Sequence, residues 1–389
     1  MSRVCCPAIA SGAAVVSLLC YAVVLVTTPA CNNELSRDYG LSYAQLGQLS
    51  LATMLGFFLT VIPAGIFADR WGKLLPMTLG CFSMASGCGV FAFANGLGWL
   101  VLGAALFGIG GGLSEANSMA LLADLYEGSK RSAAMNLAQA MFGIGAVIAP
   151  FGIGWILHLG GGWRSGYYGA ASVCFVGMLI NITALLRHRE PRLPKHEHRS
   201  NPIAIATDTS VLLLAISIFL YVGAEIGQST WLSVYFKRYL GASSSLAASS
   251  PSFLWLGIGI GRLLAAVALR VVHEGPLVRT CLAFAALCQA VLVISRAPAF
   301  GGIAAFCLGL FLGPIFPTIV SRANAVHPIA TGSVSSIVMA AGSLGAAVFP
   351  PFIGLTAEVW GLRQALWVCF GLLCVNFVLV LLVRDTDTP

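Results

Sequence analysis

The chain has 389 residues, of which 58% are hydrophobic and only 9% are charged, and its mean hydropathy is +0.90. Soluble domains carry about a quarter charged residues. Here, apolar stretches of about twenty residues, each able to cross a bilayer core of roughly 30 Å, recur from end to end. Composition therefore excludes a water-soluble protein and predicts a polytopic α-helical membrane protein. A β-barrel would show short alternating strands instead.

The net charge of +7 does not indicate nucleic-acid binding, because the basic residues lie in short loops where they set membrane topology. Most of the twelve cysteines lie within apolar runs, with no Cys-x-x-Cys pair or Cys/His cluster. We therefore expect small buried side chains, with no disulfide, metal site or cofactor. The first apolar run, from about Ile9 to Ala30, is too long for the core of a cleavable signal peptide.

Twelve apolar segments follow one another, and each is predicted to be a transmembrane helix. Their approximate ranges are 9–30, 43–68, 75–95, 98–124, 132–157, 166–186, 210–236, 249–270, 277–295, 299–321, 331–357 and 363–383. The one long polar stretch, 187–209, is predicted to be a solvated linker. The expected fold is therefore all-α, with a six-helix half at 1–186, the linker, and a second six-helix half at 210–389.

Lys and Arg counts predict the orientation. If both termini and the linker share one side, that side holds fourteen of the 21 basic residues. Arg262 lies within a segment, and the opposite side holds the other six, which are Arg37, Arg164, Lys237, Arg238, Arg296 and Arg363. The positive-inside rule then makes the first side, with both termini, cytoplasmic.

An internal repeat supports the same division. Three groups of residues recur after 200 or 201 positions: Gly56 as Gly257, Gly112 as Gly313, and Gly145-Ala146, Pro150 and Ile153-Gly154 as Gly345-Ala346, Pro350 and Ile353-Gly354. Two parallel halves related by an axis along the membrane normal are a known transporter plan, with the polar cleft between the halves near the midplane.

Residues 65–73, at the end of the second segment, read Gly-Ile-Phe-Ala-Asp-Arg-Trp-Gly-Lys. Gly65 would allow a close helix approach, and Asp69 could meet a helix N-terminus and pair with a base such as Arg131. The stretch resembles the signature loop of the major facilitator superfamily of transporters. That resemblance implies a gate on the cytoplasmic side that binds no substrate, formed here by Gly65, Asp69, Arg70, Gly72, Lys73 and Arg131. An ordinary basic loop is the alternative.

Charges within the apolar segments are candidates for function, because they are costly in a bilayer. Glu115 lies in segment four, Glu225 in segment seven and Arg262 in segment eight. A carboxyl group in an apolar setting holds its proton more tightly than in water, so it can serve proton coupling near neutral pH. Arg262 needs a partner, which Glu225 or the Glu115 region could supply; snorkelling toward the cytoplasm is the alternative. Asp124, near the cytoplasmic end of segment four, is assigned to the gate.

Amide and aromatic side chains complete the candidate substrate site. They are Asn117, Asn136, Gln139, Tyr221, Gln228, Trp231, Trp255, Gln289 and Phe316. Amides and carboxylates hydrogen-bond hydroxyl groups, and aromatic faces stack on the C–H faces of a sugar ring. The alternative is polar contact between helices and ordinary core packing.

Four stretches together resemble the L-fucose:proton symporter family and its relatives among sodium- or proton-dependent glucose carriers: the glycine-rich segment four, 136–139, 221–224 and 313–318. The resemblance covers most of both halves. It implies monosaccharide transport by alternating access, with Glu115 or Ser114 matching the acid of the fourth helix and Asn136 and Gln139 the amides of the fifth. The chain departs from the family in its first helix, where Thr28-Pro29-Ala30 stands near the family's acid and the nearest acid is Glu34.

We therefore predict a monomeric secondary transporter of a bacterial inner membrane, taking a small polar solute with H⁺ or Na⁺. Because the first-helix acid is missing, Glu225 is the candidate to replace it in coupling. A proton-driven exporter of drugs or metabolites is one alternative, and a non-transporting membrane sensor or enzyme another. No nucleophile, base and orienting acid stand out as a catalytic constellation in the sequence, which disfavours the enzyme.

Overall fold

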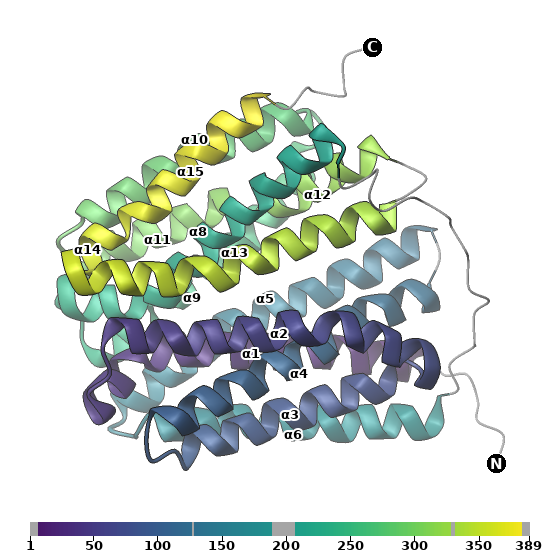
Figure 1. The fold of residues 1–389 in the computed structure, drawn as a ribbon, viewed down its shortest axis with the longest axis horizontal. Helices are drawn as coiled ribbons and strands as arrows, with labels where there is room; N and C mark the ends of the chain where they lie inside the picture. Colours follow the sequence, from purple (N-terminus) through teal and green to yellow (C-terminus); the bar gives the residue numbers. More distant parts are fainter. Residues whose placement is uncertain (1–6, 127, 189–206, 328–330, 383–389) are drawn as a thin grey trace. The chain divides into compact units, whose positions relative to one another are not determined.

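The computed structural model describes residues 7–126, 128–188, 207–327 and 331–382, which are almost entirely helical (Figure 1). Within these ranges, twelve helical spans are long and apolar enough to cross a membrane, and no residue lies in a strand. The predicted all-α class with twelve spans is confirmed. Large apolar side chains on the spans stay exposed, for example Phe82, Trp155 and Leu263, as expected of helices that face lipid.

The first six helices are α1 (Pro7–Tyr39), α2 (Tyr43–Trp71), α3 (Leu74–Ala92), α4 (Leu97–Leu125), α5 (Gly128–His158) and α6 (Arg164–Arg187). The main difference from the prediction is at the end of α1, which continues past Ala30 to Tyr39. It stops where Gly40 adopts a left-handed φ of +63°, a conformation that favours glycine. Glu34, expected at the outer end of the first segment, is therefore buried within a helix.

The remaining helices are α8 (Thr209–Tyr239), α9 (Ser244–Ala268), α10 (Glu274–Ile294), α11 (Pro298–Leu312), α12 (Ile315–Val326), α13 (Thr331–Trp360), α14 (Leu362–Ala365) and α15 (Trp367–Leu382). Segment ten, expected to be one helix, is divided into α11 and α12 at Gly313-Pro314. Proline lacks the N–H that a helix interior needs, which explains the break. Segment twelve is likewise divided into α14 and α15.

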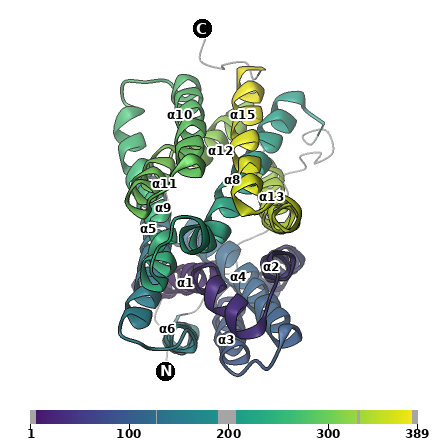
Figure 2. The same ribbon diagram turned by 90° about the vertical axis from the view of Figure 1, so that its left-hand side faces the viewer.

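The described residues form two compact units, one from 1–194 and 244–252, the other from 195–243 and 253–389. In the first unit, α2 packs on α4, α3 on α4 and α6, and α1 on α5, as Figure 2 shows for α2 and α4. In the second, α8 packs on α13 and α15, and α10 on α11 and α15. The beginning of α9 belongs to the first unit, where Ser252 donates to the carbonyl of Val147 on α5 at 2.7 Å.

Glycines at equivalent positions bring the second and fourth helices of each half together. A side chain at Gly56 of α2 would meet the carbonyl oxygen of Ala105 on α4 at 2.5 Å, and one at Gly257 of α9 would collide with that of Phe306 on α11. Gly56 and Gly257 are 201 positions apart, and so are the residues that they approach, Ala105 and Phe306. The arrangement recurs for Gly112 against Phe57 and for Gly313 against Ile258. The sequence repeat is therefore a repeat of backbone contacts, which small residues permit in membranes.

Replacing Gly257 with Val is expected to lower the free energy of unfolding by about 2 kcal/mol, because the new side chain would force α9 away from α11. Gly259 is the matched control: it lies two residues further along α9, and a Cβ there would meet nothing within 4 Å. Thermal melting of both purified variants measures the difference. Equal melting temperatures would show that the close approach is not needed.

Asp208 begins α8, just outside the membrane span, and is its N-cap. Its carboxylate accepts from the backbone N–H groups of Ser210 at 2.8 Å and Val211 at 3.3 Å, and contacts His327 Nε2 at 3.2 Å. Burial opposes ionisation of Asp208, but these three contacts outweigh it and lower the pKa of Asp208 below its ordinary value of 3.8.

The lowered pKa of Asp208 means that its stabilising effect is complete above the unfolded-state pKa. The effect is lost as the pH falls through the folded-state pKa. Asp208→Ala is expected to remove about 1 kcal/mol at pH 7, while Asp208→Asn retains a capping oxygen and loses less. The gap in melting temperature between the parent and the alanine variant should close below about pH 4. A gap that stays constant with pH would contradict the assignment.

Candidate functional site

The first cluster consists of Tyr21 on α1, Phe57 on α2, Glu115 on α4 and Phe142 on α5, all in the first unit. The buried Tyr21 ring stacks on Phe57 with 5.7 Å between centroids and tilts against Phe142 at 6.0 Å. Gly111, one turn before Glu115, leaves room for this ring, since a Cβ there would overlap it. Glu115 is half-buried and interacts electrostatically with Tyr21. Within the described part of its unit, no cationic side chain forms an ion pair with it.

The second cluster consists of Tyr221 and Glu225 on α8, Arg262 on α9 and Phe316 on α12, all in the second unit. The Tyr221 hydroxyl donates to Glu225 Oε1 at 2.9 Å, and both side chains are buried. Arg262 interacts electrostatically with both. The Phe316 ring lies 6.3 Å from that of Tyr221, in a tilted arrangement. Arg262 thus lies within electrostatic range of Glu225, one of the two partners expected from the sequence, but forms no direct ion pair with it.

The two clusters are built around equivalent tyrosines. Tyr21 and Tyr221 are 200 positions apart, and Glu115 and Phe316 are 201 apart. In the first unit the acid therefore stands on the fourth helix of the half, and in the second it stands one turn along the tyrosine's own helix. Tyr21 was not among the residues predicted from the sequence. Its spacing from Tyr221 was the signal that could have found it.

The two predicted glutamines bind each other in the second unit. Gln289 Nε2 on α10 donates to Gln228 Oε1 at 2.8 Å and lies 3.1 Å from the carbonyl of Leu366. Both side chains are fully buried, and Gln228 Nε2 and Gln289 Oε1 have no partner in the described part of the chain. Such a pair holds α8, α10 and the end of α14 together, as the alternative of polar contact between helices predicts.

The two predicted tryptophans also donate to neighbours within the second unit. The indole of Trp231 donates to the carbonyl of Pro350 at 2.9 Å, and that of Trp255 to Ser229 Oγ at 3.0 Å. Both rings are buried. These contacts position α8 against α13 and α9, and a role for either ring in substrate binding stays a prediction.

The predicted amides of the first unit differ in exposure. Asn117 is buried and donates to the carbonyl of Leu113 on its own helix at 2.9 Å. Asn136 is exposed, while Gln139 is half-buried and lies 3.9 Å from the sulfur of Met119. Asn136 therefore has the most accessible amide of the three.

The predicted gate residues gather at one end of the first unit. Lys73 pairs with Asp124 at the end of α4, and the Arg131 guanidinium donates to the carbonyl of Ala123 at 2.7 and 2.9 Å. Gly72 closes α2 with a left-handed φ of +85°. The expected pairing of Asp69 cannot be followed, because its side chain lies outside the described residues.

One expectation for this loop was wrong. Gly65 is exposed, and a Cβ there would meet nothing within 4 Å, so it makes no close helix approach to the described residues of its own unit. The close approaches of α2 lie earlier in the helix, at Gly56 and at Phe57 beside Gly112 of α4. Arg70 is also exposed.

Comparison with known families decides the class of protein. The model of the Major Facilitator Superfamily matches residues 12–336. The chain belongs to the Major Facilitator Superfamily. Its members are transporters, which confirms the prediction of a transporter rather than an enzyme and implies a small-molecule substrate and a multi-pass membrane location.

Individual relatives are distant. A glucose/galactose transporter of Brucella abortus is 27% identical over 357 residues, covering 85% of this chain and 84% of its own. The glucose/mannose transporter GlcP of Bacillus subtilis is 24% identical over 323 residues, covering 79% and 77%. Among solved structures, a bacterial homolog of the human lysosomal transporter Spinster, inward-facing and occupied, matches 97% of this chain and 98% of its own. It has a TM-score of 0.77 and 17% identity, which supports the fold alone.

Proposed function

We propose that this transporter carries a small polar solute of the monosaccharide class by alternating access, coupled to protons. The observation that carries the proposal is the second cluster. It places a hydrogen-bonded tyrosine and carboxylate, a guanidinium and an aromatic ring together within apolar spans. Charged groups at such positions are expensive and are kept for substrate or ions. Curated relatives named for glucose, galactose and mannose support the same class.

The two clusters suit different tasks. Glu225 has a cation, Arg262, within electrostatic range and accepts a hydrogen bond from the Tyr221 hydroxyl, so it has polar partners on two helices. Donors and acceptors fixed in this way can hold a solute hydroxyl, and the Phe316 ring can face the C–H side of a sugar. We assign solute binding to this cluster.

Glu115 is suited to carry the coupling proton. It is half-buried, interacts electrostatically with Tyr21, and has no ion-pair partner in the described part of its own unit. An unpaired charge is costly in such a setting, whereas the neutral acid is not. Taking up and releasing a proton would therefore change the energy of this site strongly. We therefore assign the coupling role to Glu115 in place of Glu225.

The orientation of the protein in the membrane and its cellular location complete the proposal. With the Gly65–Lys73 loop and both termini on the cytoplasmic side, the positive-inside rule is satisfied. We assign the protein to the bacterial inner membrane as a monomer of two six-helix halves joined by the 187–209 linker.

Uptake into proteoliposomes tests the function. The purified protein is reconstituted and offered labelled glucose, galactose and mannose, with an inward proton gradient, an inward sodium gradient or neither. We expect accumulation of at least one sugar under the proton gradient, and collapse on adding a protonophore. Accumulation under sodium alone would overturn proton coupling, and no movement of any sugar under either gradient would overturn the solute class.

A further inference from the structure

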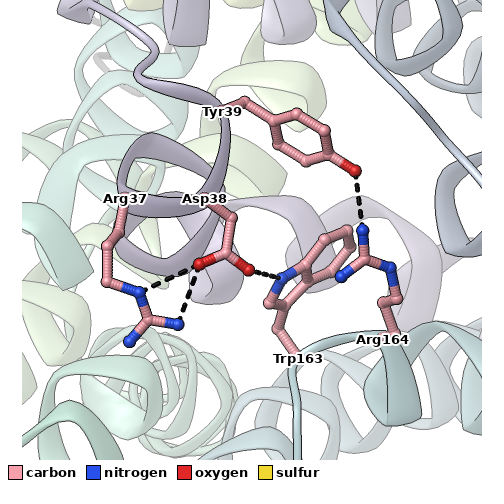
Figure 3. A network of polar contacts seen from close by, with 5 residues as sticks. All are labelled: Arg37, Asp38, Tyr39, Trp163 and Arg164. Carbon is pink, nitrogen blue, oxygen red and sulfur yellow. Dashed lines mark hydrogen bonds and ion pairs between the residues drawn. The ribbon is translucent and has the colours of Figure 1, made fainter.

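Arg164, the first residue of α6, binds the end of α3 in the first unit. Its Nε donates to the carbonyl of Ala92 at 3.1 Å, and another guanidinium nitrogen donates to the Tyr39 hydroxyl at 2.9 Å (Figure 3). That hydroxyl in turn donates to the carbonyl of Ala94 at 2.7 Å. The guanidinium also lies over the Trp163 ring, 4.4 Å from its centroid. Arg164 therefore joins the ends of α1 and α3 to the start of α6.

Neighbouring residues hold the same corner in place. The Trp163 indole donates to Asp38 at 2.8 Å, and Arg37 donates to the other oxygen of Asp38 at 2.9 Å, as Figure 3 shows. The Tyr39 and Trp163 rings meet edge to face, 6.2 Å apart. Asp38 thus ties the loop before α6 to the last turn of α1.

Arg363, in the short helix α14, occupies the matching corner of the second unit. Its guanidinium donates to the carbonyl of Ser295, at the end of α10, at 2.6 Å. It lies 6.0 Å from the centroid of the Tyr239 ring, which stacks on Tyr235. The Tyr235 hydroxyl donates to the carbonyl of Val293 at 2.8 Å. Here too, one arginine and a tyrosine bind the end of the third helix of the half.

Equivalent pairs of carbonyl groups are bound in the two corners, but the arginine and the tyrosine that donate to them are exchanged. Ala92 and Val293 are 201 positions apart, as are Ala94 and Ser295. In the first unit, arginine binds the earlier carbonyl and tyrosine the later one. In the second unit, tyrosine binds the earlier and arginine the later. The arginines are 199 positions apart. Tyr239, 200 positions after Tyr39, lies beside Arg363, but the carbonyl of Val293 is bound by Tyr235, one turn earlier on α8, so the corner recurs while its individual bonds differ.

These carbonyls need partners for a general reason. The last carbonyls of a helix lack intrahelical donors and carry the negative end of the helix dipole. At the edge of a membrane, an unsatisfied carbonyl is costly, and an arginine satisfies both its hydrogen-bonding and its electrostatic needs.

We propose that Arg164 and Arg363 are a matched pair of positioning residues. Each caps the third helix of its half and ties it to the first and sixth helices, so that the three helix ends move as one body during transport. The first helices carry Tyr21 and the Tyr221–Glu225 pair, so loosening either corner would misplace a cluster. The inference depends on the transporter class and not on the solute.

Hydrogen exchange of the full-length protein in lipid nanodiscs tests this directly. Arg164→Met is expected to speed exchange about tenfold in residues 93–97 and 163–167, because a charged hydrogen bond is lost, and to leave 295–299 and 362–367 unchanged. Arg363→Met is expected to give the reverse pattern. Unchanged exchange at a variant's own corner, or faster exchange throughout the protein, would overturn the proposal.

Lysine variants separate positioning from general stability. Arg164 uses two nitrogens and Arg363 one in these bonds. Lysine is a single compact charge without the planar fork. Arg363→Lys should therefore regain most of the protection, and Arg164→Lys little. Tyr168→Phe is the control, since the exposed Tyr168 hydroxyl makes none of these bonds and phenylalanine keeps the edge-to-face contact of the ring with Phe93. Equal rescue at both corners would contradict the assignment.

Transport gives a second readout. For a sugar that the parent protein carries, Arg164→Met and Arg363→Met are expected to lower the turnover rate about tenfold with an unchanged KM. A raised KM with unchanged turnover would instead place the arginines in solute binding and overturn the positioning role. If no sugar is carried, the exchange experiment still decides the proposal, so the two failures can be told apart.

Discussion

Replacing Glu115 with Gln is expected to abolish proton-driven accumulation while leaving the exchange of solute across the membrane intact. Glutamine keeps the size and hydrogen-bonding capacity of a protonated glutamate but cannot release a proton. The variant would therefore resemble a transporter in which Glu115 is permanently protonated. In a half-buried site with no ion pair in the described part of its unit, this change also removes no salt bridge.

Two assays on the same proteoliposomes measure this outcome. Accumulation under an inward proton gradient should fall to the level of empty liposomes, while counterflow between equal solute concentrations should stay within about twofold of the parent protein. Glu115→Asp, which keeps a titratable carboxyl group, should retain partial accumulation. Accumulation by Glu115→Gln at the parent level would remove Glu115 from the coupling role.

The fold could be predicted because each span is a local property of the sequence. In lipid, the backbone N–H and C=O groups of about twenty successive apolar residues must bond to one another within one helix. The range of each helix therefore follows from composition alone. The glycine spacing of 201 indicated the two repeated halves, and the structure adds that Gly56 and Gly257 lie at close helix approaches. The extension of α1 was not predictable in this way, because its polar last turns are held by contacts with residues distant in sequence, such as Asp38 with Trp163.

The candidate site was predictable only in part, because partners on different helices depend on helix rotation. Glu225 and Arg262 stood out as charges in apolar runs, and the structure brings them together. Gln228 stood out equally, yet it faces Gln289 in the interior of the second unit. Tyr21 is an ordinary aromatic residue in an apolar segment. Only its contact with Glu115 and its equivalence to Tyr221 mark it as a candidate.

A double-mutant cycle can separate what the charges of the second cluster contribute from what the size of its side chains contributes. Glu225→Gln leaves Arg262 without its anion and weakens the acceptor of the Tyr221 hydroxyl. Arg262→Gln leaves the buried carboxylate without its cation. Each single variant is expected to lose about 2 kcal/mol of the free energy of unfolding and all sugar accumulation. In the double variant both charges are gone, so the two stability losses should largely cancel.

Restored stability should not restore transport. The double variant keeps a folded second unit with amides in place of the carboxylate and guanidinium, so thermal melting should approach that of the parent protein. Sugar binding, measured by scintillation proximity with labelled sugar, should stay at least about tenfold weaker, because the charged partners for a solute hydroxyl are missing. Tyr221→Phe is the milder comparison, since it removes one hydroxyl and no charge. If the double variant recovers both melting temperature and sugar binding, the second cluster serves only to hold α8 against α9, and solute binding must be assigned elsewhere.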